Sequence, residues 1–345
     1  MVVIDFSTPP WLITYFHIIG IISICLNSLG LYLLLYQNNK LDKIRYYMLA
    51  YQIIVFLTDV HLTFLMQPVA LFPMFAGYTV GLLVTWFDTS IHFSMMAVMV
   101  LVVVQLEFLN LCFKMKHQTI AKTLNTHVLP DWFWRCIDVV CVLCPTCLAL
   151  WFHTLRLTKH EQWKVIRKDW PQYIHEFEKL SNFDIYVKTW WFILMMLTII
   201  GGGIVVASFF FLFSFDLLHM MSSLKSKISA NRYQRHKEAI QNLIVQFATS
   251  SFCVVPPVCL TIVIMSELEQ AQLFSTLCIL WFSTHSSANM ISLLIFFPPY
   301  RNFILGKLRL KTVLTSGTKA STTVQPFGAI RNPEQRSNLS AVEVS

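Results

Sequence analysis

The sequence predicts an all-α, polytopic membrane protein in which a bundle of seven transmembrane helices crosses the bilayer. Three observations predict this fold. Apolar residues make up 56% of the 345-residue chain, against the ~45–50% that is usual in soluble domains. Charged residues make up 13%, about half of the roughly 25% found in soluble domains. Seven apolar runs are each long enough to cross a bilayer, which takes about 20 residues of helix.

The seven runs follow one another with short connections, apart from a longer loop between the fourth and the fifth. They lie at residues 11–36, 47–71, 85–112, 133–152, 190–218, 239–265 and 274–297. The first run is too long for the apolar segment of a signal sequence and no basic residue precedes it, so we expect it to be retained. The second and third are separated only by a short apolar turn containing Pro73 and Gly77.

Three regions follow from this pattern. Residues 1–10 form a short extracellular N-terminus. Residues 11–310 form the seven-helix domain, which ends in a short helix on the membrane surface. Residues 311–345 form a tail rich in Ser and Thr with only one aromatic residue. Such a tail cannot bury a core, so we expect it to be disordered in the cytosol.

The orientation follows from the basic residues, which gather in cytosolic loops of membrane proteins. The first and third connections, the connection after the fifth run and the tail carry most of the Lys and Arg. The opposite side has one exception, the loop 153–188, which holds seven basic and five acidic residues. The pattern predicts that the N-terminus lies outside and the C-terminus in the cytosol. It also explains the net charge of +8 better than binding to nucleic acid does.

Four polar side chains lie in the middle of apolar runs, where an ionisable or amide group is costly. They are Asn27 in the first run, Asp59 in the second, and His285 and Asn289 in the seventh. His285 and Asn289 are four residues apart and so share a helix face. We expect the four to form one buried polar network. It serves either as a conformational switch or ion site, or as a structural lock between helices.

A second polar group marks the outer end of the third run. Asp88 and His92 are spaced i, i+4 and are expected to share a face, followed by the flexible side chains of Met95 and Met96. Together with His285 they are candidate contacts for a ligand in the outer half of the bundle. The alternatives are solvation of the polar pair at the interface and ordinary packing of the methionines.

Two backbone features suggest a mobile bundle. Pro256 and Pro257 interrupt the sixth run and predict a kink, because proline removes a helix hydrogen bond. The kink is either a hinge or a fixed bend. Residues 201–203 are three consecutive glycines in the fifth run, which allow close packing or a bend.

No enzyme motif is present, and no phosphate-binding loop or pair of carboxylates at one depth is found. The chain is therefore expected to be neither an enzyme nor a cofactor protein. Cys141, Cys144 and Cys147 have a metal-like spacing but lie in an apolar run, where thiols act as small apolar groups. No metal site is expected.

Several short stretches carry a family resemblance, which covers about residues 5–310. They read PW at 10–11, YFHIIG at 15–20, IRYY at 44–47, YQ at 51–52, TDVHLT at 58–63, MQP at 66–68, CFKMKHQ at 112–118 and PYR at 299–301. With these the chain resembles the nematode serpentine chemoreceptors of class I (Sri), in the Str superfamily. Rhodopsin-type motifs are missing: the third run ends in QLEF at 105–108, and the seventh lacks Asn-Pro-x-x-Tyr.

The resemblance implies a chemosensory G-protein-coupled receptor in the plasma membrane, in the cilium of a sensory neuron. A small molecule would bind in the outer half of the bundle, and the sixth helix would move about Pro256 and Pro257. A heterotrimeric G protein would then bind at the cytosolic face. The residues expected to border that face are Lys114, Lys116, His117, Arg232, Arg235, Tyr300 and Arg301. Three alternatives remain: a ligand-gated channel of inverted topology, a transporter, and a family member that folds but binds nothing.

Overall fold

The computed structural model describes residues 4–36, 44–266, 270–303 and 305–306. Residues up to Arg301 form one unit, and 302–345 form a second. All that follows concerns the first unit. The predicted disordered tail, 311–345, lies outside the described residues, as do residues 304 and 307–310 of the predicted surface helix that ends at residue 310.

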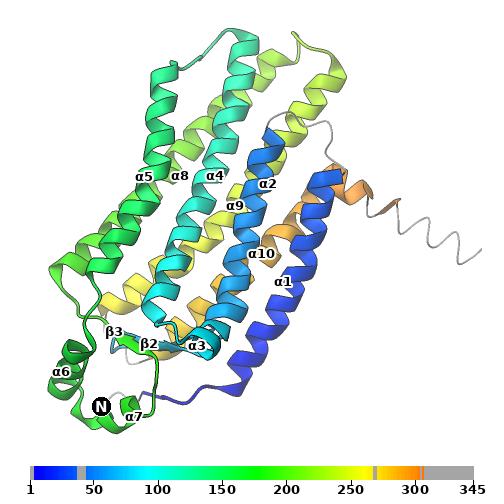
Figure 1. Ribbon diagram of the computed structural model, residues 1–345. Coiled ribbons are helices and arrows are strands. Elements are labelled where there is room, and N and C mark those ends of the chain that lie inside the picture. Colours follow the sequence, from blue (N-terminus) through cyan, green and yellow to red (C-terminus); the bar gives the residue numbers. More distant parts are fainter. Residues whose placement is uncertain (1–3, 37–43, 267–269, 304, 307–345) are drawn as a thin grey trace, which may run out of the picture. The chain divides into compact units, whose positions relative to one another are not determined.

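Seven long helices run alongside one another (Figure 1). They are α1 (Pro10–Tyr36), α2 (Ile44–Val60) with its π-helical continuation η1 (His61–Met66), α4 (Ile91–Leu124), α5 (Asp131–Thr154), α8 (Trp190–Leu224), α9 (Ala230–Ser266) and α10 (Ala271–Phe296). Among the described residues, six of these are long and apolar enough to cross a membrane, and α9 is the seventh of the bundle. The predicted seven-helix fold is confirmed.

The helix surfaces suit a bilayer. Large apolar side chains such as Val142, Leu150, Phe211, Leu212 and Phe215 are more than half exposed. In a soluble protein a patch of this kind would be a liability, whereas lipid tails cover it at no cost. The helical backbone satisfies its own hydrogen bonds, as hydrocarbon requires.

Two predicted boundaries are wrong. The second run was expected to stay helical to residue 71, but η1 ends at Met66 and Gln67 turns into the left-handed region, with a φ of 47°. Residues 68–71 form a strand instead. The third run was expected to start at residue 85, but a separate short helix, α3 (Leu82–Phe87), ends at Asp88 with a φ of 51°. The long helix α4 begins only after Ser90.

The apolar turn expected near Pro73 is part of a small antiparallel sheet. It consists of β1 (Pro68–Leu71), β2 (Ala76–Thr79) and β3 (Phe183–Ile185), in the order β1-β2-β3. Phe183 pairs with Tyr78 and Ile185 pairs with Ala76. Strands of three or four residues are too short for their alternation to stand out in a sequence of this composition.

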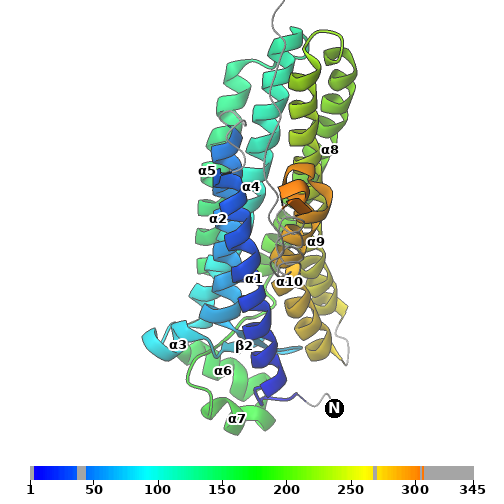
Figure 2. The same ribbon diagram turned by 90° about the vertical axis from the view of Figure 1, so that its right-hand side faces the viewer.

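The sheet is part of a cap at one end of the bundle (Figure 2). We use "cap" for residues 4–9, α3, the sheet and the loop elements α6 (Lys159–Asp169), η2 (Pro171–Tyr173) and α7 (Ile174–Glu178). Its core buries Leu71, Ile166, Phe177 and Phe183 against Ile4. The cap therefore has an apolar core of its own, and the N-terminal segment belongs to it.

Close contacts fix the helices at the cap end and in the bundle. A Cβ atom added at Gly81 would lie 2.4 Å from the carbonyl oxygen of Leu65, and one at Gly30 would lie 2.6 Å from the Met290 sulfur. The glycines at 201–203 of α8 behave differently, because no atom lies within 4 Å of such a Cβ. They therefore do not provide the close packing that the sequence allowed, and α8 continues through them.

Candidate functional site

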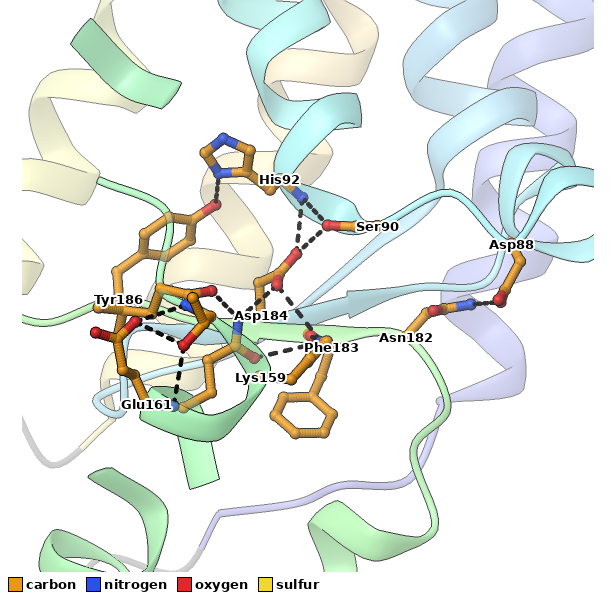
Figure 3. Close-up of polar contacts among 12 residues, drawn as sticks. Asp88, Ser90, His92, Lys159, Glu161, Asn182, Phe183, Asp184 and Tyr186 are labelled. Carbon is orange, nitrogen blue, oxygen red and sulfur yellow. Dashed lines mark hydrogen bonds and ion pairs between the residues drawn. The ribbon is translucent and has the colours of Figure 1, made fainter. Parts of the chain in front are cut away.

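A buried carboxylate joins the cap to the bundle (Figure 3). Asp184 on β3 is 2% exposed. It accepts hydrogen bonds from the Ser90 hydroxyl, from the backbone N–H of His92 at 3.1 Å and from Gln162 Nε2 at 2.8 Å. Lys159 Nζ lies 3.5 Å from its Oδ1 atom. One side chain thus holds the start of α4, strand β3 and helix α6 together.

The surroundings of Asp184 favour its ionised form. Burial alone would raise the pKa of this carboxyl, but the hydrogen bonds from Ser90 and Gln162, the charge of Lys159 and the His92 amide together lower it. Ser90 is the N-cap of α4, so the carboxylate also lies at the positive end of that helix. Asp184 is therefore a charged anchor at neutral pH.

His92, the second residue of α4, lies next to this anchor and is fully buried. Its Nδ1 atom is 2.9 Å from the Tyr186 hydroxyl, and its ring stacks on Phe152 with 4.6 Å between ring centroids. The other ring nitrogen, Nε2, is buried and has no hydrogen-bond partner within the described chain. A buried polar atom without a partner is rare and calls for an explanation.

Asp88 does not share a helix face with His92, so that prediction is wrong. The helix is broken between them, and Asp88 is the left-handed cap of α3 rather than a residue of α4. Its exposed carboxylate accepts a hydrogen bond from Asn182 in the cap. Asp88 therefore lies on the cap surface, whereas His92 lies inside the bundle.

Met95 and Met96 follow His92 along α4 and are half-buried. Both pack against an apolar cluster formed by Phe152, Phe192 and Met195. The structure thus places an unpartnered imidazole nitrogen next to flexible apolar side chains at the cap end of the bundle.

The predicted polar network exists in part. Asn27 and Asp59 are both buried and are linked through Ser23, whose hydroxyl donates to Asp59 and accepts from Asn27 Nδ2 at 2.8 Å. Asn27 also donates to the Ser286 hydroxyl at 2.8 Å and accepts from Gln52 Nε2 at 2.6 Å. The network joins α1, α2 and α10.

His285 and Asn289 are buried, but within the described residues no hydrogen bond joins them to Asn27 or Asp59. Thr249 of α9 donates to Asn289 Oδ1 at 2.6 Å. His285 Nδ1 lies 2.9 Å from the Phe282 carbonyl oxygen, and its Nε2 atom lies 3.5 Å from Gln105 Nε2 of α4. The polar residues of α10 therefore tie three different helices to it rather than forming one cluster.

The end of the bundle opposite the cap holds a carboxylate between two imidazoles. Asp216 of α8 lies 2.7 Å from His117 Nε2 of α4 and 2.6 Å from His127 Nδ1, in the loop after α4. Lys114 of α4 pairs with Asp138 of α5. His117, predicted for the coupling surface, is thus buried in a contact between helices. Lys116 is buried as well.

Of the other predicted coupling residues, three are exposed and one is buried. Arg232, Arg235 and Arg301 are exposed. Tyr300 is 2% exposed and its ring packs edge-on against Phe297, 4.7 Å away.

The predicted hinge lies in α9. Pro256 is buried within this helix, which is continuous through both prolines.

Sequence reasoning missed Asp184 and Tyr186, which define the surroundings of His92. The sequence signal for Asp184 is weak: it lies between the apolar residues Phe183 and Ile185, and three residues are too few to predict a strand. It also missed Ser23, Gln52 and Ser286, since small polar residues are common in membrane helices and carry little signal on their own.

Comparison with known proteins agrees with this architecture. The crystal structure of squid rhodopsin aligns with a TM-score of 0.55 and 11% sequence identity, covering 91% of this chain and 91% of that chain. At this identity the likeness shows the fold alone. The search of curated proteins finds no significant match.

A family model described as "Serpentine type 7TM GPCR chemoreceptor Sri" matches residues 2–304. This match covers nearly all of the described chain, including the cap and all seven helices. The chain therefore belongs to the Sri family of serpentine seven-transmembrane G-protein-coupled chemoreceptors.

Proposed function

We propose that this receptor binds a small molecule at the cap end of the bundle, which faces outward, and activates a heterotrimeric G protein at the opposite, cytosolic end. The observation that carries the binding site is the buried, unpartnered Nε2 atom of His92. A ligand that hydrogen-bonds to this nitrogen satisfies it, and buried polar groups left without a partner are costly.

The surroundings of His92 suit a ligand with one polar group on an apolar body. Phe152 and Tyr186 form aromatic walls around the imidazole, and Met95 and Met96 continue the apolar lining along α4. Methionine side chains adapt to ligands of different shape. We place Asp88 at the cap surface above this site and His285, near Gln105, at its floor.

The coupling surface lies at the other end of the bundle in this proposal. Exposed Arg232, Arg235 and Arg301 offer positive charge to the G protein. Basic residues gather on the cytosolic side of membrane proteins, and this supports an outward N-terminus. The family places the receptor in a plasma membrane, and a sensory cilium is its proposed location.

The first experiment establishes orientation and then the ligand site in one cell line. Epitopes before Met1 and after Ser345 are stained with and without permeabilisation, and the N-terminal epitope is expected to be accessible without it. Cells are then screened with a panel of small molecules, using calcium release through a co-expressed G protein. His92→Phe is expected to weaken the response to an active compound at least about tenfold, the loss of one hydrogen bond to a buried group.

The matched control is His153→Phe, because the His153 ring lies 5.7 Å from that of His92 but its side chain is exposed. It should leave the response unchanged. Equal losses in both variants, or none in His92→Phe, would remove His92 from the ligand site. An intracellular N-terminus would support the channel alternative, and uptake of labelled compound without a G protein would support a transporter.

A further inference from the structure

We infer that the exposed face of α6 in the cap is a binding site for small organic anions that carry a sulfonate, phosphate or carboxylate on an apolar body. This inference does not depend on the proposed signalling, because it concerns binding to the cap. It starts from the loop 153–188, which carries seven basic residues on the side of the membrane where they are otherwise scarce.

The basic residues of α6 form one stripe. His160, Lys164, Arg167 and Lys168 are spaced i, i+4, i+7 and i+8, so they lie on one face of the helix. All four side chains are exposed. The macrodipole explains bases in the last turn, such as Arg167 and Lys168, but not those nearer the start of the helix.

A hollow of about 430 Å³ lies along this face and is lined by the same four residues and Trp163. Its size is within the range of roughly 300–1,000 Å³ typical of small-molecule sites. The half-buried Trp163 ring packs edge-on against Phe183, 5.7 Å away, which fixes it as an apolar wall. The site thus combines cations with a flat aromatic surface.

The helix that carries the stripe is held rigidly from its other side. Ile166 is fully buried, and Gln162 donates to Asp184 and to the Leu157 carbonyl oxygen. The N-terminus is closed by a capping box between Thr158 and Glu161. The positions of the basic side chains along the helix are therefore set before any ligand binds, which lowers the entropic cost of binding.

The acids of the loop offset the positive charge of the stripe only in part, since Glu161 interacts electrostatically with His160 and Lys164 and Asp169 follows Lys168 in the sequence. Asp184 pairs with Lys159, Glu176 pairs with Lys179, and the Glu161 carboxylate accepts from Thr158. Within the described chain, Lys164, Arg167 and Lys168 form no ion pair with an acidic side chain. An anion is the chemistry that complements such a face.

The test uses the full chain in nanodiscs of phosphatidylcholine, whose headgroups carry no net charge. The probe is 4-(trifluoromethyl)benzenesulfonate, and its ¹⁹F relaxation is followed as protein is added. The variant Lys164→Ala, Arg167→Ala, Lys168→Ala is expected to bind it at least about tenfold more weakly, since charged hydrogen bonds are lost. The control Lys225→Ala, Lys227→Ala, Lys237→Ala removes the same charge from three exposed residues in and around the loop between α8 and α9 and should bind normally.

Further arms separate the sources of binding. Trp163→Leu should weaken the aromatic sulfonate but not inorganic sulfate, and the neutral sulfonamide analogue should not bind. If the triple variant melts at a lower temperature than the wild type, Lys164→Met, which keeps the length of the side chain, replaces it and is expected to weaken binding about fivefold, since it removes one exposed contact. The proposal is overturned if the α6 variants bind as well as the wild type, or if the control loses as much. Heparin is tested as a polyanion. The proposal is also overturned if heparin binds and the small sulfonate does not, because the stripe would then be a surface for polyanions.

Discussion

Asp184 shows how a single charged residue organises the cap end of this receptor. Four groups, two at the start of α4 and two in α6, converge on its carboxylate: Ser90, the His92 amide, Gln162 and Lys159. Hydrogen bonds to charged groups are among the stronger contributions to stability. The same side chain positions the start of α4, so it also positions His92 next to the cap.

Replacing Asp184 with Asn is expected to lower stability by about 1–3 kcal/mol, because the buried donors around it lose their charged acceptor. The pH dependence has a definite sign. The pKa of Asp184 is lowered from 3.8 in the fold. Its contribution is therefore present above that unfolded-state value and is lost as the pH falls through the lower folded-state value.

Thermal unfolding in nanodiscs between neutral pH and about pH 3 measures this contribution. The wild type should lose more stability in acid than Asp184→Asn, which has no carboxyl to protonate at this site. Glu178→Gln is the control, because Glu178 is an exposed cap acid that lies 3.7 Å from His175. A variant at 184 with the full acid sensitivity of the wild type would contradict the role of Asp184.

For single residues, the sequence predicted which polar side chains are buried, but it did not predict their hydrogen-bond partners. Asn27, Asp59, His92, His285 and Asn289 are all buried, as their places in apolar runs suggested. Their partners were not foreseeable, because a contact such as that between Asn27 and Ser286 joins residues 259 positions apart. Only the packing of the helices decides which side chain on α10 meets α1.

At the scale of elements, α9 is the candidate for movement. Its two prolines leave backbone carbonyl groups without their usual helix partners, which makes bending easier there. On the N-terminal side of the prolines, α9 makes polar contacts with two other helices. Thr249 donates to Asn289 of α10, and the Ser250 hydroxyl lies 2.7 Å from the Tyr51 hydroxyl of α2. A bend at Pro256 would therefore change how α9 meets α2 and α10.

The double variant Pro256→Ala, Pro257→Ala is expected to straighten and stiffen α9 and so to reduce ligand-evoked signalling, by roughly fivefold if about 1 kcal/mol of bias is lost. The measurement is G-protein-dependent calcium release at matched surface level. Pro145→Ala is the control, because Pro145 also lies inside a long helix, α5. Normal signalling by the double variant would mean that the kink is fixed and not a hinge.

The helices were predictable as elements and the cap was not. A long apolar run in a membrane protein predicts a helix, because a helix satisfies the hydrogen bonds of its own backbone in hydrocarbon. The sheet depends on pairing between β2 and β3, whose residues Tyr78 and Phe183 are more than 100 positions apart in the sequence. No local pattern encodes such a pairing, and the apolar residues of β1 looked like the end of a helix.

At the scale of the whole molecule, composition and run lengths were enough to predict the seven-helix bundle, and the likeness to squid rhodopsin agrees. The direction of the chain across the membrane is a separate property. It depends on where Lys and Arg lie, and the loop 153–188 runs against the general pattern. Part of the charge of that loop is paired within the cap, where Asp184 lies near Lys159 and Glu176 pairs with Lys179.

The two ends of the molecule are each held by a carboxylate, and the proposed signal must loosen the second. Asp216 links α8 to α4 through His117 and reaches His127 in the following loop. If the proposed activation separates these helices at the end opposite the cap, the contact stabilises the inactive arrangement. Removing it then shifts the population toward the active arrangement without a ligand.

Asp216→Ala is accordingly expected to raise ligand-independent signalling about fivefold, the shift that roughly 1 kcal/mol produces. Asp138→Ala is the matched control, because it removes one negative charge from the same end and breaks only the exposed pair with Lys114. Basal calcium release is measured at equal surface level. An unchanged basal signal in Asp216→Ala would show that this contact is only structural. So would an equal rise in Asp138→Ala. A contact that stabilises the inactive state must raise basal signalling when it is removed, and the loss of one negative charge elsewhere must not have the same effect.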